Sequence, residues 1–223
     1  MKQSKLFFLL LPFIIIAIPW VYLAFIWNEL PAIVPTHFGF SGKPDAFGPK
    51  NEIFLAPVIL SIVGPGVYFL LRNINRIDPK RKYAATTSGV LSKLAVVMLM
   101  LLCAIMLFIF YWTLHGNIKG MPFFYSIISL FIAYIGNLMH SIKPNYFAGF
   151  RLPWTLESED NWRMTHILVS KLWFAGGIIL AIASLVLNTK MTMIVFFSGM
   201  AVMVIVPIIY SYNLYKQSLK EKQ

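Results

Sequence analysis

Apolar residues come in six long runs along the chain, and shorter polar stretches separate the runs. A helix that crosses the hydrocarbon core of a bilayer, about 30 Å thick, needs roughly 20 predominantly apolar residues. The runs are of this order, so the pattern predicts six transmembrane helices. We place them at Leu6–Trp27, Ile53–Leu71, Leu94–Leu114, Pro122–Met139, Leu172–Leu187 and Ile194–Tyr212.

Little sequence remains outside these runs for a soluble domain. The first run is too long and too apolar for the core of a signal peptide, and Trp27 to Leu30 follow it in place of a small-residue cleavage site. The predicted fold is therefore all-α: a six-helix membrane bundle. We divide the chain into residues 1–71 (two helices and the loop 28–52), 72–121 (a basic loop and the third helix) and 122–223 (three helices and the loop 140–171).

The basic residues give this bundle an orientation. Short loops rich in Lys and Arg stay in the cytoplasm, and fifteen of the 19 Lys and Arg residues fall on the side that holds both termini. The other four are Lys43, Lys50, Lys119 and Lys190. The asymmetry predicts cytoplasmic termini, an extracytoplasmic loop at 28–52, here the outer loop, and a cytoplasmic loop at 140–171, the inner loop.

Overall composition agrees with a membrane protein. Hydrophobic residues make up 59% of the chain and charged residues 12%, against about 45–50% and 25% in soluble domains. The net charge of +11 mostly reflects topology, with attraction to anionic lipids as a second effect. No nucleic-acid-binding module accompanies it, so we expect no nucleic-acid partner.

Acidic side chains are absent from all six runs, since the eight Asp and Glu residues lie between them. Ion-coupled transporters usually keep an ionisable group near the membrane midplane, so this distribution disfavours one. A passive transporter, with a cavity at the glycine and proline positions inside the runs, is an alternative. We expect these positions to be packing devices whose freed carbonyls are satisfied by neighbours. They are Pro19, Gly64–Gly66, Gly136–Asn137, Gly176–Gly177 and Pro207.

The outer loop is rich in Pro and Gly from residue 30 to 50, which predicts a compact succession of turns. Its Phe residues would rest at the headgroup boundary or over helix ends, or else form a binding surface for an extracellular partner. We expect His37 to bond the loop backbone. A metal site with Asp45 and Glu52 is the alternative, although the spacing is not diagnostic. The lone Cys103 can form neither an internal disulfide nor a thiolate cluster, and no cofactor is predicted.

The inner loop is turn-like as far as Pro153 and then becomes helical. Thr155 is the expected N-cap, followed by acidic residues suited to the positive end of the helix dipole, and Glu159 can pair with Arg163. An apolar helical stripe, which also carries a histidine, follows the loop into the fifth span, so we expect an interfacial helix with Trp154 and Trp162 at headgroup level. The stripe consists of Trp162, His166, Val169 and Trp173.

Polar groups gather at the start of this helix and allow three interpretations. They are Arg151, Glu157, Asp160, Asn161 and His166. In the structural one, Arg151 pairs with a carboxylate and His166 bonds a carbonyl. In the second, the cluster docks a partner. In the third, an enzyme acts on lipid or peptide with His166 as base and Arg151 binding a phosphate or carboxylate, but no nucleophile, metal or phosphate-loop motif supports it.

Residues 137–166, "NLMHSIKPNYFAGFRLPWTLESEDNWRMTH", resemble the signature of the SdpI family of bacterial membrane proteins. The matching positions are Gly136, Asn137, Lys143, Pro144, Asn145, Gly149, Arg151, Pro153, Trp154, Thr155, Leu156, Trp162, Thr165 and His166. Phe150, Leu152 and Ile167 depart from it. The outer loop, "PTHFGFSGKPD", is similar to an uncharacterised domain that commonly precedes this signature. The strings "HFGFSGKP" and "YFAGFRLP" share a loose pattern, which leaves an inverted repeat as an open alternative.

The resemblance implies a non-enzymatic bacterial inner-membrane protein that gives immunity to a secreted antimicrobial peptide. In the type member, toxin binding also lets the protein hold a cytosolic repressor, of the ArsR type, at the membrane. The implied inner-loop binding residues are Asn145, Gly149, Arg151, Pro153, Trp154, Thr155, Glu157, Trp162 and His166. Those of the outer loop are His37, Phe38, Gly39, Gly42, Pro44 and Asp45.

Overall fold

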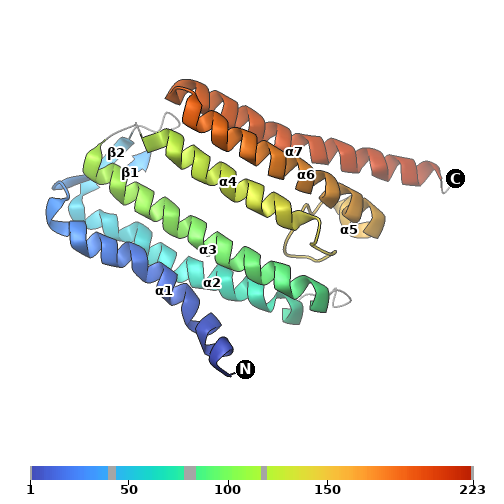
Figure 1. The fold of residues 1–223 in the computed structure, drawn as a ribbon, viewed down its shortest axis with the longest axis horizontal. Coiled ribbons are helices and arrows are strands. Elements are labelled where there is room, and N and C mark those ends of the chain that lie inside the picture. The colour runs from blue at the N-terminus through green and yellow to red at the C-terminus, as the bar shows by residue number, and fades with distance from the viewer. Residues whose placement is uncertain (1, 40–43, 78–83, 117–119, 222–223) are drawn as a thin grey trace. The chain divides into compact units, whose positions relative to one another are not determined.

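The structure, a computed structural model, describes residues 2–39, 44–77, 84–116 and 120–221 (Figure 1). Helices dominate it, with one small two-stranded sheet among the described residues. The elements are α1 (Lys2–Ile26), η1 (Trp27–Glu29), β1 (Ile33–Phe38), β2 (Pro44–Pro49), η2 (Lys50–Phe54), α2 (Leu55–Ile77), α3 (Ala84–His115), α4 (Met121–Met139), α5 (Pro153–Glu157), α6 (Glu159–Val186) and α7 (Thr189–Lys220).

All six predicted spans are confirmed as helices long and apolar enough to cross a membrane. Large apolar side chains stand outward on them, such as Phe25 at 79% and Val186 at 78% exposure. Such surface is stable only against lipid, so the chain is a multi-pass membrane protein. α3 and α7 extend beyond the predicted apolar runs, because the more polar residues at their ends contain no proline and continue the same helices.

The chain divides into two compact units. Unit 1 comprises Met1–Leu70 and Ala95–Phe124, and unit 2 comprises Leu71–Leu94 and Tyr125–Gln223. The outer loop therefore belongs to unit 1, and the inner loop belongs to unit 2. Across both units, no Asp, Glu, Lys or Arg of the described residues is buried, as expected for apolar spans with their charges at the surface.

The outer loop in unit 1 is a two-stranded antiparallel ribbon, where the sequence predicted only turns. β1 pairs with β2 from Ile33↔Pro49 to Phe38↔Pro44, with two irregularities around His37. Proline cannot donate to a ladder and is tolerated on edge strands. Both strands of a two-stranded ribbon are edges, so Pro35, Pro44 and Pro49 fit without losing a central hydrogen bond.

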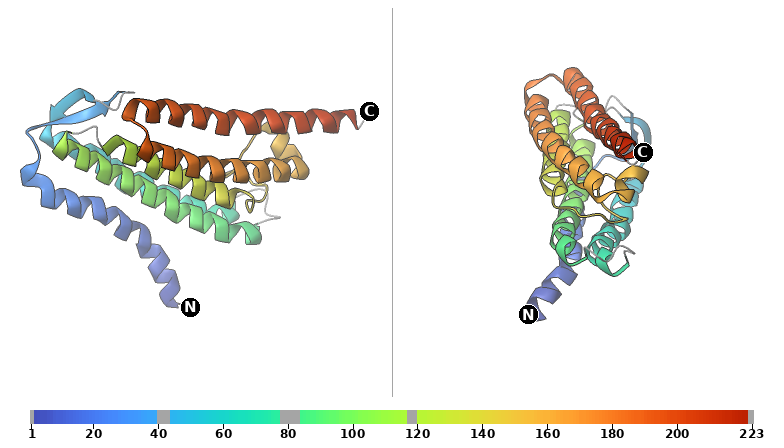
Figure 2. Two further views of the ribbon diagram at one scale, coloured as in Figure 1. Left: turned by 45° about the horizontal axis from the view of Figure 1, so that its top comes forward. Right: turned by 90° about the vertical axis from the view of Figure 1, so that its right-hand side faces the viewer.

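In unit 2, α6 and α7 run antiparallel and side by side (Figures 1 and 2). Asn188 begins α7 as its N-cap, with its side chain accepting from Met191 N. Close approach of α4 and α6 depends on two glycines. A Cβ at Gly136 would lie 2.6 Å from the Phe174 nitrogen, and one at Gly177 would lie 2.6 Å from the Ser129 carbonyl oxygen. These glycines are packing devices, as predicted.

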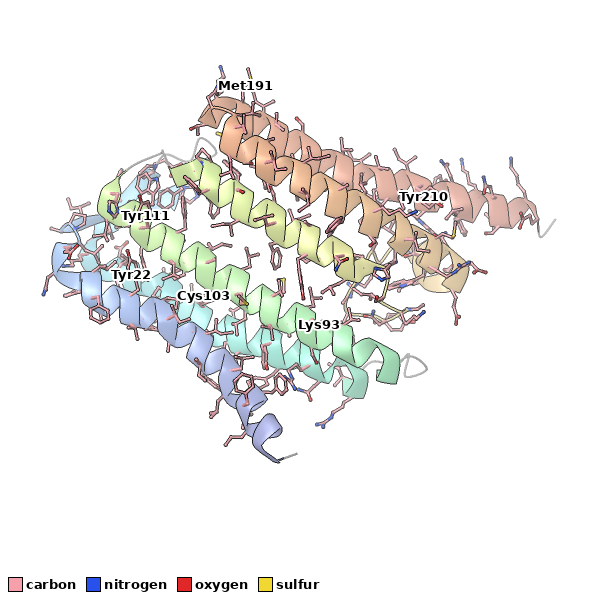
Figure 3. All side chains as sticks on the ribbon, in the orientation of Figure 1. Tyr22, Lys93, Cys103, Tyr111, Met191 and Tyr210 are labelled. Carbon is pink, nitrogen blue, oxygen red and sulfur yellow. The ribbon has the colours of Figure 1, made fainter. Side chains whose placement is uncertain are left out.

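Prolines inside the helices leave carbonyls without a helical partner, because proline has no N–H to donate to residue i−4. Side chains from other helices fill three of these positions. Tyr68 Oη donates to Phe8 O at 2.8 Å, four residues before Pro12. Cys103 Sγ lies 3.6 Å from Ile15 O, four before Pro19, on the α3 segment labelled in Figure 3. Trp173 Nε1 donates to Met203 O at 2.9 Å, four before Pro207.

The third of these contacts gives a testable coupling. Trp173→Phe should lower the free energy of unfolding by about 1–2 kcal/mol, because it leaves the Met203 carbonyl unpaired. In a Pro207→Ala background the new amide at 207 can bond that carbonyl, so the same substitution should have a clearly smaller effect. Unfolding in mixed micelles measures all four proteins of the cycle. Additive effects would contradict the contact.

Candidate functional site

Asn145 fixes the first half of the inner loop. Its Oδ1 accepts from the backbone nitrogens of Phe147 and Ala148 at 2.8 and 2.7 Å. Its Nδ2 donates to the carbonyls of Lys143 and Ala148 at 2.9 and 2.8 Å. The side chain is buried and uses both oxygen lone pairs and both amide hydrogens. Such a complete set of local bonds holds the chain in one turn conformation.

His166 on α6 bonds the loop from the opposite side. Its Nε2 accepts from Phe150 N at 3.0 Å, and its Nδ1 lies 2.8 Å from Trp162 O. Since one partner is a donor and the other an acceptor, the ring is neutral with its proton on Nδ1. The structural interpretation predicted a carbonyl bond for His166, and the structure contains one. Both ring nitrogens are occupied by backbone, which leaves neither available as a general base.

Gly149 lies against this histidine. Its φ of +119° is a conformation that other residues rarely adopt. A Cβ there would lie 2.5 Å from His166 Nε2 and 3.0 Å from the Trp162 ring. Trp162 stacks on His166 with ring centroids 4.1 Å apart and donates from Nε1 to Ile142 O at 2.8 Å. The loop thus closes over α6 only because position 149 has no side chain.

The predicted apolar stripe exists but faces protein. Trp162 and Val169 are buried in a cluster with Met139 and Ile142, and Trp173 packs against it. Trp162 therefore does not face lipid headgroups, contrary to the expected interfacial placement, because protein covers it and only 1% of it is exposed. The inner loop folds back over α6 and covers this face.

The helix start also differs from the prediction. Thr155 lies inside the short helix α5, where its Oγ1 accepts from Leu152 N at 2.9 Å and bonds the Phe150 carbonyl at 2.9 Å. Ser158 is the N-cap of α6, and its side chain accepts from Asn161 N at 3.2 Å. Pro153 suits the start of α5, because its fixed φ matches a helix and an N–H at the first helical position would have no helical partner. α6 then continues into the fifth span, as predicted.

Ser211 on α7 accepts hydrogen bonds from both α5 and α6. No sequence motif indicated this role. Trp154 Nε1 donates to Ser211 Oγ at 3.0 Å, and Asn161 Nδ2 donates to Ser211 O at 2.9 Å. Trp154 also packs against the rings of Tyr212 and Tyr215. The aromatic residues of α7 at spacing three were the available signal, but a serine gave none.

Several residues of the inner loop remain on the surface, among them the candidates Arg151 and Glu157. Tyr146, Phe147, Arg151 and Glu157 are exposed. Arg151 Nη1 donates to the Tyr146 carbonyl and forms no ion pair with a carboxylate of the described chain, contrary to the structural interpretation. Arg163 contacts Asp160, 3.4 Å between Nη2 and Oδ1, and not the predicted Glu159.

In the outer loop, His37 Nδ1 lies 2.5 Å from Asp45 Oδ1, across the ribbon. The prediction of a backbone partner for His37 was wrong, because the β1–β2 pairing brings Asp45 beside it. No group of three metal-ligand side chains occurs in the described parts of the chain. Phe38 packs edge-on against Trp112 with centroids 4.9 Å apart, and Gly39 follows β1. Gly42 lies outside the described residues.

Comparison with known proteins matches the same regions. The SdpI/YfhL protein family matches residues 141–211, which run from the inner loop to Ser211. A domain of unknown function, DUF1648, matches residues 14–60 and includes the outer loop. Both resemblances inferred from the sequence are confirmed, and neither of these families is described as one of enzymes.

One curated relative is an uncharacterised protein of Archaeoglobus fulgidus. It is 38% identical over 61 residues, which are 27% of this chain and 33% of that protein. The chain thus spans about a third of the length of the curated relative it matches. No solved structure matches the chain.

Proposed function

We propose that this protein gives a bacterial cell immunity to a secreted antimicrobial peptide and that its inner loop docks a cytosolic partner, an ArsR-type repressor. The match of residues 141–211 to the SdpI/YfhL family supports the proposal. In this scheme the protein lies in the inner membrane with both termini in the cytoplasm. The parts 1–71 and 122–223 contribute the outer and inner loops, and 72–121 links them.

One observation supports docking over catalysis in the inner loop. The side chains of Asn145, Thr155 and His166 form hydrogen bonds with the loop's own backbone. The surface they hold in place presents exposed Tyr146 and Arg151. Tyr and Arg are enriched among residues that carry binding energy at interfaces, and a loop already fixed before binding loses little entropy on association.

The outer loop provides the peptide-facing surface in this proposal. Ile33 and Phe47, on the two strands, are 64% and 60% exposed. The His37–Asp45 pair lies on the same ribbon. Apolar side chains next to a carboxylate suit a hydrophobic peptide that is neutral or cationic.

Two readouts separate the two halves of the proposal. A strain that lacks the gene should be more sensitive than the parent to one member of a panel of secreted hydrophobic peptides, and the wild-type gene should restore survival. Arg151→Ala should weaken recruitment of the repressor to membranes about tenfold or more. Arg163→Ala, which removes another exposed guanidinium, on α6, is the matched control and should recruit normally.

Each result bears on a different statement. If the deletion strain resists every peptide as well as the parent does, immunity is wrong. If Arg151→Ala and Arg163→Ala recruit the repressor equally well, the inner loop is not the docking surface, whatever the survival assay shows.

A further inference from the structure

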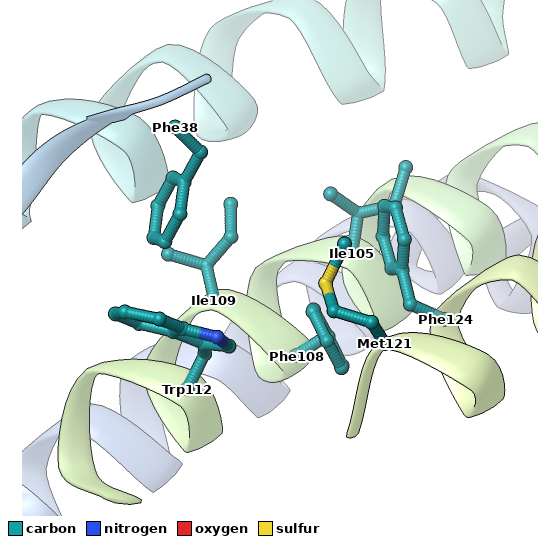
Figure 4. A pocket seen from close by; sticks show the side chains of 7 residues that line it. All are labelled: Phe38, Ile105, Phe108, Ile109, Trp112, Met121 and Phe124. Carbon is teal, nitrogen blue, oxygen red and sulfur yellow. The ribbon is translucent and has the colours of Figure 1, made fainter. Parts of the chain in front are cut away.

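An apolar pocket in unit 1 lies beside the outer loop and has no role in the function proposed above. Its volume is about 170 Å³. Phe38 of β1, Trp112 and three neighbours on α3, and Met121 and Phe124 of α4 line it (Figure 4). A cavity of about 150 Å³ lined by Leu, Ile and Phe holds benzene, so this one has room for a small apolar group.

The Trp112 indole makes this pocket more than a packing gap. Trp112 is 6% exposed, and its Nε1 is buried with no hydrogen-bond partner in the described part of the chain. Figure 4 shows that nitrogen at the ring edge that faces Phe108 and Met121. A buried donor left unpaired costs about 1–3 kcal/mol and is rare in native proteins. A ligand with a hydrogen-bond acceptor would therefore be stabilised in this pocket.

The other tryptophans show how unusual this one is. Indole nitrogens of Trp20, Trp154, Trp162 and Trp173 each donate to an oxygen of the protein at 2.8–3.0 Å. Trp27 carries the Lys50 ammonium over its ring. Satisfying the indole donor inside the protein is thus the rule for this chain, and Trp112 departs from it at a pocket.

We propose that this pocket binds a membrane lipid through one acyl ester, with the ester carbonyl accepting from Trp112 Nε1 and the adjoining methylenes in the pocket. Trp112 lies one turn before the end of α3 at His115. Tryptophans near the ends of spans lie at the depth of the lipid headgroup boundary, where ester carbonyls are found. The apolar lining suits the hydrocarbon, and the bilayer supplies this ligand at high local concentration.

Ester and ether lipids distinguish this proposal. The protein, with ¹⁵N-labelled tryptophan, is placed in nanodiscs of a diacyl phosphatidylcholine or of its dialkyl ether analogue with equal chains. The Trp112 indole proton, assigned with Trp112→Phe, should resonate further downfield in the ester discs, because only they offer a carbonyl acceptor. The four indoles that already donate to protein oxygens are internal controls for folding and should shift much less.

Filling the pocket gives a second test. Ile105→Phe occupies part of its volume and should move the Trp112 signal in ester discs to its position in ether discs. Leu130→Phe, a change of the same kind at an exposed position of α4, should not. An equal Trp112 signal in both lipids overturns the proposal. So does a signal that responds only to added N-acetyl-phenylalanine amide, which would assign the pocket to peptides.

Discussion

Gly149→Ala is expected to lower the free energy of unfolding by about 2–5 kcal/mol, a large effect for one methyl group. Two causes add. A φ of +119° is strained for alanine, and the new Cβ would lie 2.5 Å from His166 Nε2, so the ring must move and weaken its bond to Phe150. Thermal or denaturant unfolding of the purified protein in detergent measures the change.

Gly66→Ala is the matched control, since a Cβ there meets nothing within 4 Å. It should leave stability unchanged or raise it by up to about 1 kcal/mol, because alanine favours a helix. Combining Gly149→Ala with His166→Ala removes the clash with His166, but neither the close contact with Trp162 nor the backbone strain, so the double variant should lose less than the sum. Strict additivity would show that the two positions do not touch.

This geometry explains the roles of both the buried and the exposed residues of the family motif. Gly149 is fixed by lack of space, and His166 and Trp162 by their backbone partners at Phe150 and Ile142. Arg151 bonds only a carbonyl that is itself on the surface. Folding therefore accounts for the first group and leaves the second free for recognition, which is why stability and partner recruitment should respond to different substitutions.

The sequence predicted the six spans because their signal is local: the length of each apolar run is enough to indicate that it crosses a bilayer. It also predicted the stripe from Trp162 to Trp173, because helical spacing is periodic. The sequence did not predict what this stripe packs against. Trp162 meets the Ile142 carbonyl twenty residues away, and nothing in the spacing distinguishes a covering loop from a lipid headgroup.

The helix caps and the partners of the proline-freed carbonyls could not be predicted from the sequence for a related reason. Thr155 and Ser158 are both good N-cap types, and only the extended backbone at Ser158, between α5 and α6, makes Ser158 the N-cap and leaves Thr155 inside α5. Prolines indicated which carbonyls would need partners. The donors, among them Cys103 and Trp173, come from other helices, so their identity depends on tertiary packing.

Asn145→Asp should destabilise the protein by about 3 kcal/mol or more, although the two side chains have nearly the same shape. The carboxylate can still accept from Phe147 and Ala148 nitrogens. However, a second anionic oxygen then replaces the amide donor and faces the carbonyls of Lys143 and Ala148 at 2.8–2.9 Å. An acceptor against two acceptors in a buried site is unfavourable both by repulsion and by loss of solvation.

Two comparisons make this result specific to the loop. Asn188→Asp introduces the same atoms at the N-cap of α7, where the side chain only accepts from Met191 N, and aspartate caps as well as asparagine does. Its stability should match that of the wild type. Acidification should restore part of the stability of Asn145→Asp, because protonation returns one donor to the site. If both variants unfold alike, or if low pH gives no recovery, the Asn145 amide does not hold the inner loop.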